Sequence, residues 1–387
     1  MTAQTQSQEA LPRMAIWKAL LLTLPIVPFA ASGLAMTLMS GDAQLIELIP
    51  GLVVCILLAV VFFRMLVTGK THRYRSALFI VLGLSVPLYL MPQLIEAYGT
   101  VMLTPEMTYA GKVQFCPMTM FMVLLPAVLK GVVIFPGAIA YGAMWFLLWM
   151  GTSLTIGRGW CSWGCIFGGW DEFFSRLRKK ALVKHVDRKW RFLPFAVLLA
   201  IVLLSAITFH PIYCEWLCPF KVVSEFEAPT SLATKVALGI FPVTFLGLVV
   251  ALPLLTKKRI QCALFCPFGA LQSFFNKVSI FELRIDLDRC SQCKRCLREC
   301  PTFSLDEGSL VSGKALMSCT RCGQCVDSCP KGAMSYHIKG TRIGVSPNVA
   351  RLLFLYPAYI LFCGFGGGVV TGALWRVLRL ITTGSMI

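Results

Sequence analysis

Charged residues are scarce in this chain of 387 residues. Only 14% are Asp, Glu, Lys or Arg, whereas 57% are hydrophobic. This composition excludes an ordinary soluble globular protein, in which about 25% of the residues are charged. Several apolar runs exceed the roughly 20 residues that a helix needs to cross a bilayer. We therefore expect a polytopic α-helical membrane protein.

Acidic residues and histidines are also few. The chain has 18 Asp and Glu against 36 Lys and Arg, and only 4 His. The basic residues lie beside apolar runs, which is typical of membrane orientation signals and not of nucleic-acid binding. We expect His72, His185 and His337 to be isolated, which excludes paired haem ligands inside the membrane. No glycine-rich nucleotide loop and no convincing secretory signal is present.

Seven apolar runs predict about seven spans. The fourth run is too long for one span, so we interpret it as a re-entrant segment followed by a helix over about 136–156. The alternative is two short spans, which would invert the orientation of every segment that precedes this run. The basic segments 157–191 and 257–346 alternate with the base-poor loops 39–47 and 210–234, which predicts a cytoplasmic N-terminus and an outer C-terminus. The runs are 15–38, 45–67, 76–95, 119–156, 192–209, 236–255 and 348–372.

This pattern predicts four regions. We expect transmembrane helices over 1–156, a membrane core with cysteine pairs over 157–256, a cytoplasmic domain over 257–346, and a last transmembrane helix with its tail over 347–387. Such a chain belongs in the cytoplasmic (inner) membrane of a bacterium or archaeon.

Cysteine, by contrast, is abundant, with 17 residues. Residues 290–301 read CSQCKRCLRECP and residues 319–330 read CTRCGQCVDSCP. Both are C-x2-C-x2-C-x3-C-P, the run that binds [4Fe–4S] clusters in bacterial ferredoxins, where the fourth cysteine ligates the other cluster. A zinc site with four thiolates is the alternative. The predicted ligands are Cys290, Cys293, Cys296 and Cys329 for one cluster, and Cys319, Cys322, Cys325 and Cys300 for the second.

The domain over 257–346 is therefore predicted to be a small α+β ferredoxin domain of the bacterial 2[4Fe–4S] type, inserted before the last span. Basic side chains lie between its cysteines. They could offset cluster charge, dock an acidic donor or simply be solvated. They are Lys294, Arg295, Arg298 and Arg321.

Three further cysteine pairs share the spacing C-x3-C. They occur in GRGWCSWGC, YCEWLCP and QCALFCP. Residues four apart lie on the same face of a helix, so each pair could present two thiolates together. The first and third pairs follow spans on the cytoplasmic side and predict an inner third cluster. The alternative is that these thiols pack as small hydrophobes. The predicted ligands are Cys161, Cys165, Cys262 and Cys266.

The remaining pair, Cys214 and Cys218, falls in a predicted outer loop. Together with Cys116, and with His210 or Cys363, it could form an outer cluster or another metal site. A disulfide in an oxidising compartment and structural thiols are the alternatives. The predicted cofactors are thus two [4Fe–4S] clusters and one or two additional iron–sulfur clusters.

The stretches GRGWCSWGC and CALFCPFGALQSFF and the paired ferredoxin motifs resemble the membrane polyferredoxin family of NapH-, NosR- and CcoG-like [4Fe–4S] proteins. The resemblance covers about residues 155–340. It matches the pairs Cys161/Cys165 and Cys262/Cys266 to the family's two juxtamembrane cysteine pairs. Ile166 stands where a proline usually follows the first pair.

We therefore expect a membrane-embedded iron–sulfur protein that relays electrons between a cytoplasmic or quinone-linked partner and an acceptor at or beyond the outer face. It would serve as an electron-transfer subunit of a quinol dehydrogenase-like oxidoreductase complex, without a catalytic residue of its own. Its partners would be the lipid bilayer, other redox subunits, and a quinone or a periplasmic redox protein, but no nucleic acid. The alternatives are an assembly or regulatory redox factor and a metal-ion reductase of the CcoG type.

Overall fold

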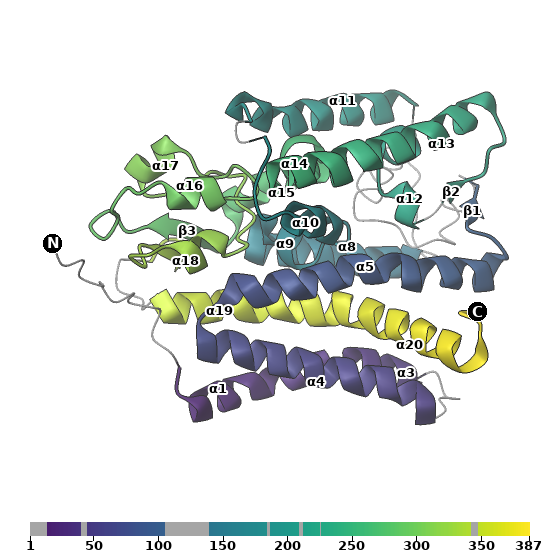
Figure 1. Cartoon of the computed structure of the whole chain (residues 1–387), viewed down its shortest axis with the longest axis horizontal. Helices are drawn as coiled ribbons and strands as arrows, with labels where there is room; N and C mark the ends of the chain where they lie inside the picture. Colours follow the sequence, from purple (N-terminus) through teal and green to yellow (C-terminus); the bar gives the residue numbers. More distant parts are fainter. Residues whose placement is uncertain are drawn as a thin grey trace.

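Helices that run back and forth between two ends of the molecule make up most of the structure (Figure 1). This computed structural model describes residues 14–39, 45–104, 139–183, 186–208, 212–224, 226–341 and 347–387. The segment with the ferredoxin motifs lies at one end, here called the ferredoxin end, and the C-terminus lies at the opposite, far end.

Six helical stretches of the described residues are long and apolar enough to cross a membrane. They correspond to six of the seven predicted runs, so the polytopic helical fold is confirmed. The fourth run is represented by α8 (Ile139–Ile156), which is not among the six, and the predicted re-entrant segment before it lies outside the described residues. The six are Ile16–Ala35, Ile46–Thr68, Thr71–Tyr98, Lys189–Thr208, Leu232–Thr256 and Asn348–Thr383.

The N-terminal and C-terminal helices form one side of the bundle. Their sequences are apolar around most of the helix, as expected where one face meets lipid and the other meets protein. α4 and α5 pack against α20, and α5 ends at Gly99, whose φ of 72° closes the helix in the left-handed conformation. The elements are α1 (Ile16–Thr23), α2 (Val27–Ala30), α3 (Ser32–Met39), α4 (Leu45–Thr68), α5 (Thr71–Tyr98), β1 (Met102–Leu103), α19 (Pro347–Leu361) and α20 (Gly367–Thr383).

The middle of the chain forms the other side of the bundle. α10 lies against α5, where a Cβ on Gly83 would come within 2.9 Å of the backbone of Gly169, so both positions need glycine. The elements are α8, α9 (Trp160–Trp163), α10 (Gly168–Leu177), α11 (Leu193–Thr208), α12 (Lys221–Ser224), β2 (Phe226–Glu227), α13 (Leu232–Thr244), α14 (Leu252–Thr256) and α15 (Pro267–Val278).

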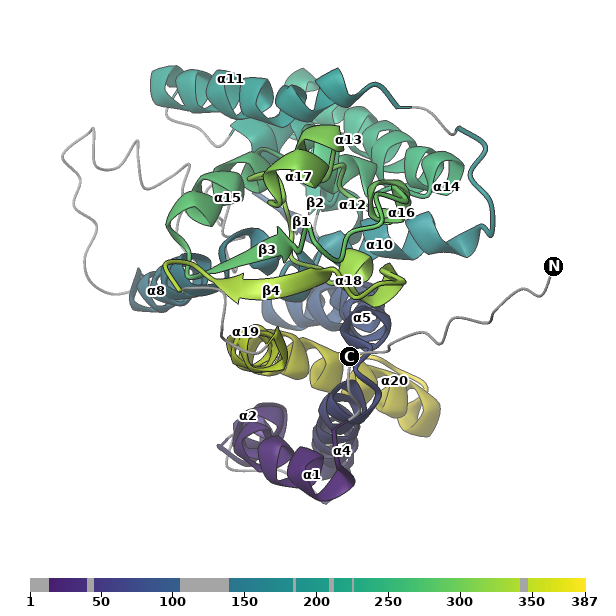
Figure 2. The same ribbon diagram turned by 90° about the vertical axis from the view of Figure 1, so that its left-hand side faces the viewer.

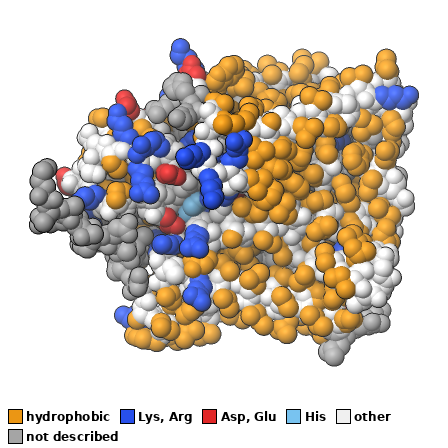
Figure 3. Space-filling view, viewed as in Figure 1, with side chains coloured by type: hydrophobic (Ala, Val, Ile, Leu, Met, Phe, Trp, Pro, Cys, Tyr) orange, Lys and Arg blue, Asp and Glu red, His pale blue; other side chains and the backbone are white. Residues whose placement is uncertain are grey.

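The surface agrees with a membrane setting. Hydrophobic side chains cover the helical part of the visible face, and Lys and Arg side chains gather at the ferredoxin end (Figure 3). The borders of the basic segments 157–191 and 257–346 lie at this same end (Figure 1).

The ferredoxin domain lies between the fifth and sixth of these spans. Strand β3 (Phe281–Ile285) pairs antiparallel with β4 (Met334–Ile338), so that Phe281 faces Ile338 (Figure 2). Alternate residues of β3 are buried, as expected for a strand with one covered face. Three short helices complete the domain: α16 (Arg295–Glu299), α17 (Glu307–Ser312) and α18 (Gln324–Ser328).

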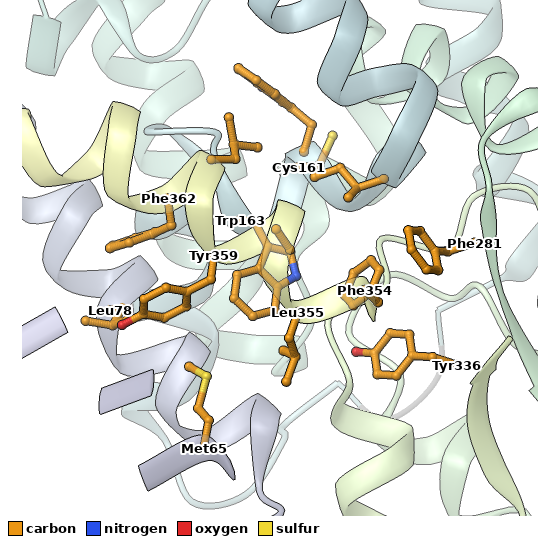
Figure 4. Packing of buried hydrophobic residues seen from close by; sticks show 14 of the residues in the cluster. Met65, Leu78, Cys161, Trp163, Phe281, Tyr336, Phe354, Leu355, Tyr359 and Phe362 are labelled. Atoms are coloured by element: carbon orange, nitrogen blue, oxygen red, sulfur yellow. The ribbon is translucent and has the colours of Figure 1, made fainter. Parts of the chain in front are cut away.

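Aromatic side chains join this domain to the helices. The ring of Tyr336 stacks on Phe354 of α19 at 4.4 Å between centroids, and Phe281 meets the same ring edge-on at 5.5 Å. Trp163 packs on Phe354 from the side of the membrane core (Figure 4). The two parts therefore share one hydrophobic core, which fixes the ferredoxin domain to the bundle.

Candidate iron–sulfur sites

Two small cavities in the ferredoxin domain are each lined by four cysteines. Both sets agree with the division of ligands that the motif spacing predicted. Cavity 1 is lined by Cys290, Cys293, Cys296 and Cys329. Cavity 2 is lined by Cys300, Cys319, Cys322 and Cys325.

The two motifs adopt the same local conformation. Gln292 and Arg321 have φ near 50°, and Lys294 and Gly323 also have positive φ, at equivalent places in the two loops. The left-handed backbone conformation at these residues turns each loop tightly, so that three thiols of a motif reach one cavity.

Backbone amides point at equivalent sulfur atoms. The amide of Ser304 donates to Cys300 Sγ at 3.2 Å, and the amide of Ala333 donates to Cys329 Sγ at 3.3 Å. Hydrogen bonds to ligand sulfurs are one means by which proteins set the potential of an iron–sulfur cluster.

The donor chemistry fits a cluster better than a single ion. Among the described residues, no three His, Cys, Asp or Glu side chains lie close enough to hold one metal ion, whereas zinc needs its sulfurs within about 2.3 Å. Burial raises the pKa of Cys319 to about 12, so a thiolate there requires the positive charge of bound metal. The four thiols around each cavity therefore suit a [4Fe–4S] cluster.

The two cavities differ in exposure. Cys293 of cavity 1 is exposed, and the amide of Arg295 lowers the pKa of this thiol. Cavity 2 faces the membrane core. There Arg321 is buried and donates to the carbonyl of Ile156 and to Ser279 Oγ, so it docks the domain instead of facing solvent.

A buried histidine connects cavity 2 with the membrane core. His72 Nδ1 lies 3.2 Å from the carbonyl oxygen of Cys322 and 3.3 Å from Arg75 Nη2. Arg75 Nη1 in turn donates to the carbonyl of Ser162 at 2.8 Å. The sequence does not reveal this contact of His72, because the cysteine loop follows 250 residues later in the chain.

A second polar chain runs beside the first. Asn276 Nδ2 donates to the carbonyl of Cys319 at 2.8 Å, and its Oδ1 accepts from the amide of Arg158 at 2.8 Å. Arg158 Nη2 donates to the carbonyl of Cys262 at 2.8 Å. Cavity 2 and the cysteine pairs of the membrane core are thus neighbours.

Four cysteine pairs of this chain end in the same way, although the turn is π-helical in two of them and α-helical in the two of the ferredoxin domain. A helical turn of five residues carries a cysteine at its second position and is followed by a second cysteine and a proline. The second cysteine is extended, with φ from −59° to −74° and ψ from 109° to 117°, because a following proline disfavours the helical conformation. The turns are Tyr213–Leu217, Gln261–Phe265, Arg295–Glu299 and Gln324–Ser328.

In the ferredoxin domain the two thiols of such a turn line different cavities. Cys296 lines cavity 1 and Cys300 lines cavity 2, and Cys325 and Cys329 are divided in the same way. This is the division that the ferredoxin motif predicts, in which the fourth cysteine reaches the other cluster.

The first pair forms a closely similar turn without the proline. The amide of Cys165 donates to the carbonyl of Trp160 at 3.0 Å, and that of Cys266 donates to Gln261 at 2.8 Å, in both cases five residues back. Ile166 therefore does not disturb the turn.

Arginine 259 brings the first and third pairs together. Arg259 Nη2 donates to the carbonyl of Cys161 at 2.7 Å and to Cys262 Sγ at 3.2 Å. Burial is the main cause that raises the pKa of Cys165 to about 11 and that of Cys266 to about 12. The four cysteines predicted for an inner site lie in adjacent turns.

Buried charge surrounds these turns. Arg75, Arg158 and Arg259 are at most 2% exposed, and the buried carboxylates beside them are Asp171 and Glu172. Buried charges are costly unless they are balanced. The surplus of positive charge suits an anionic group such as a cluster held by thiolates.

The pair Cys214–Cys218 lies beside the third pair. Tyr213 Oη accepts a hydrogen bond from Gln261 Nε2 at 3.2 Å. Figure 1 shows α12, directly after Cys218, between α13 and α5. The outer site stays a prediction: two of its predicted members, Cys116 and His210, lie outside the described residues, and Cys363 is buried.

Two families of iron–sulfur proteins match the chain. A 4Fe–4S dicluster domain matches residues 282–330, and a 4Fe–4S binding domain matches 139–185, 190–228 and 238–285. No solved structure matches the chain.

Three curated relatives carry names that bear on function. The putative electron transport protein YccM of Escherichia coli is 25% identical over 39% of this chain and 43% of its own length. The regulatory protein NosR of Pseudomonas aeruginosa is 28% identical over 40% of this chain and 22% of its own length. The ferredoxin-type protein NapH of Haemophilus influenzae is 25% identical over 41% of this chain and 56% of its own length.

The chain spans about two thirds or less of the curated relatives that it matches, from 66% down to 22% of their lengths. The two family matches cover the cysteines of both cavities and all three cysteine turns of residues 157–266. On these grounds the chain is similar to membrane polyferredoxins, and it carries a 4Fe–4S dicluster domain at residues 282–330.

Proposed function

We propose that this chain conducts electrons between the ferredoxin end and the far face of a bacterial or archaeal cytoplasmic membrane, with the ferredoxin domain in the cytoplasm. The observation that carries the proposal is the succession of thiol-lined sites from exposed Cys293, through cavity 2, to the cysteine turns of the membrane core. Basic residues at the ferredoxin end support the orientation.

The proposed ligands follow the geometry. The four cysteines of cavity 1 and the four of cavity 2 would each hold one [4Fe–4S] cluster. The membrane turns would hold a further one, with Cys161, Cys165, Cys262 and Cys266 as its first candidates. Such clusters supply one-electron carriers when bound.

The chain's own residues give each site a different role. Cys293 opens cavity 1 to a partner, whereas the aromatic core around Phe354 excludes water from the passage behind cavity 2. Arg75 and Arg158 hold the inner turns against the ferredoxin domain and supply positive charge near the thiolates. A quinone-linked partner or a redox protein at the far face would complete the path across about 30 Å of hydrocarbon.

The test is the content of iron and acid-labile sulfide in anaerobically purified protein. We expect about 12 of each per chain, since each cubane cluster holds about four. Replacing both Cys165 and Cys266 by Ser should remove about four of each and leave the spectra of the ferredoxin clusters intact. Cys55→Ser in α4 is the matched control and should change nothing. A wild-type content of about eight would overturn the inner site.

A further inference from the structure

One short sequence occurs three times in the membrane core. The copies read CSWGCIF at 161–167, CEWLCPF at 214–220 and CALFCPF at 262–268. Each has C-x3-C, then Ile or Pro, then Phe. The three segments that match the 4Fe–4S binding family contain one copy each. The pair Cys214–Cys218 therefore has the same local chemistry as the two pairs assigned to the inner site.

The three turns contact one another pairwise. Phe167, from the first, stacks on Phe220, from the second, with centroids 4.7 Å apart and planes inclined by 21°. The second and third meet through Tyr213 and Gln261, as described above. The third and first meet through Arg259. The turns thus converge on one region although their positions in the chain are about fifty residues apart.

The second cysteine of each turn is in an equivalent environment. Burial raises the pKa of Cys165, Cys218 and Cys266, and backbone amides two or three residues further on oppose that rise at each of them. These amides are those of Phe167 and Gly168 for Cys165, Phe220 for Cys218, and Gly269 for Cys266.

The ferredoxin domain shows what such a turn does with its second cysteine. Cys300 and Cys329 each reach across to the cavity that the neighbouring motif builds. Cys218 has the same extended conformation before a proline, with φ −74° and ψ 109°. Its turn can be irregular at membrane depth because other parts of the protein bury it.

We infer that Cys218 is a ligand of the inner iron–sulfur site, which is therefore built by three turns and not by two. The inference rests on the proposed function, because it assigns a ligand to the inner cluster proposed there. A cluster takes four thiolates. If Cys218 is one of these four ligands, then one of the four cysteines proposed first is not a ligand. Replacing each of those four cysteines by serine in turn identifies the one that is not.

The experiment compares iron, sulfide and low-temperature EPR of the full chain in its wild-type, Cys218→Ser and Cys55→Ser forms. We expect Cys218→Ser to lose about four irons and the signal of the inner cluster, while both ferredoxin signals remain. Cys55→Ser should match the wild type.

The outcomes separate this inference from the proposed function. A wild-type content of about eight irons means that no inner cluster exists, and both fail together. If the wild type holds about 12 irons and Cys218→Ser holds the same, only the ligand assignment is overturned. A variant that retains both ferredoxin signals is folded at cavities 1 and 2, so its loss of iron is local to the inner site.

Discussion

Glutamate 172 of α10 is a buried carboxylate that contacts three arginines. Its carboxylate is 1% exposed and lies 2.7 Å from Arg75, 2.8 Å from Arg176 and 3.7 Å from Arg259. Burial alone would raise the pKa of Glu172, but these three arginines hold that pKa well below its usual range. The carboxylate is therefore charged, and it neutralises Arg75 and Arg259, which are 1% and 0% exposed.

We expect Glu172→Gln to destabilise the protein strongly. The amide keeps the shape of the side chain but leaves buried guanidinium groups without their counter-charge, and breaking a buried pair in this way costs roughly 3–5 kcal/mol. The apparent Tm should fall by roughly 6–20 °C, on the scale of domains of 150–250 residues. The assay is thermal unfolding in detergent at one scan rate, followed by intrinsic fluorescence.

The matched control is Glu307→Gln on the ferredoxin domain. Glu307 pairs with Lys294 at 2.7 Å, but its side chain is 70% exposed. Exposed pairs contribute about 0–1 kcal/mol, so the control should be nearly neutral. Adding Arg75→Met to Glu172→Gln should restore part of the loss, because it removes one uncompensated charge. Equal shifts for Glu172→Gln and Glu307→Gln would refute the reasoning.

Two further predictions concern the ferredoxin domain. Gly157→Ala should loosen the docking of the ferredoxin domain and speed its limited proteolysis, because Gly157 has φ 53° and a Cβ there would lie 2.8 Å from Arg321 Nη1. Gly151→Ala is the control and should have no such effect, because a Cβ at Gly151 meets open space. Equal proteolysis of the two variants would count against this account. Burial raises the pKa of Asp306, but the hydrogen bond from Arg191 and the amide at the start of α17 outweigh burial and lower it. This carboxylate therefore contributes stability above its unfolded pKa of about 3.9, and the contribution is lost as the pH falls through the lower folded value. Hydrogen exchange of α17 between pH 5 and 3 should show that loss, and Arg191→Gln should reduce it; identical pH profiles for the two proteins would contradict the prediction.

The ferredoxin cavities could be predicted from the sequence because their ligands lie within two compact motifs. The spacing around Cys290–Cys300 and Cys319–Cys329 determines which thiols a short loop can bring together, and the cavities contain the predicted sets. The six membrane spans could also be predicted from the sequence, since each is a run of residues long and apolar enough to cross a bilayer.

The inner turns were harder to predict because they depend on tertiary contacts. Charge counts place the loop with Cys218 outside the membrane, and they give no sign of the contact between Tyr213 and Gln261. Nothing in the sequence pairs Arg75 with Glu172, and only the structure shows this buried ion pair. Helical spacing also does not predict that the second cysteine of a pair is extended before its proline, as Cys266 is.

The central claim is that this chain conducts electrons through a membrane, and electron transfer into sealed vesicles tests it most directly. Purified protein would be placed in liposomes that enclose ferricyanide, and dithionite would be added outside under anaerobic conditions. The account predicts that the enclosed ferricyanide is reduced only in vesicles that contain the protein, and more slowly when Cys165 and Cys266 are both replaced by Ser. If external dithionite bleaches the clusters while the enclosed ferricyanide stays oxidised, the proposed path does not cross the membrane.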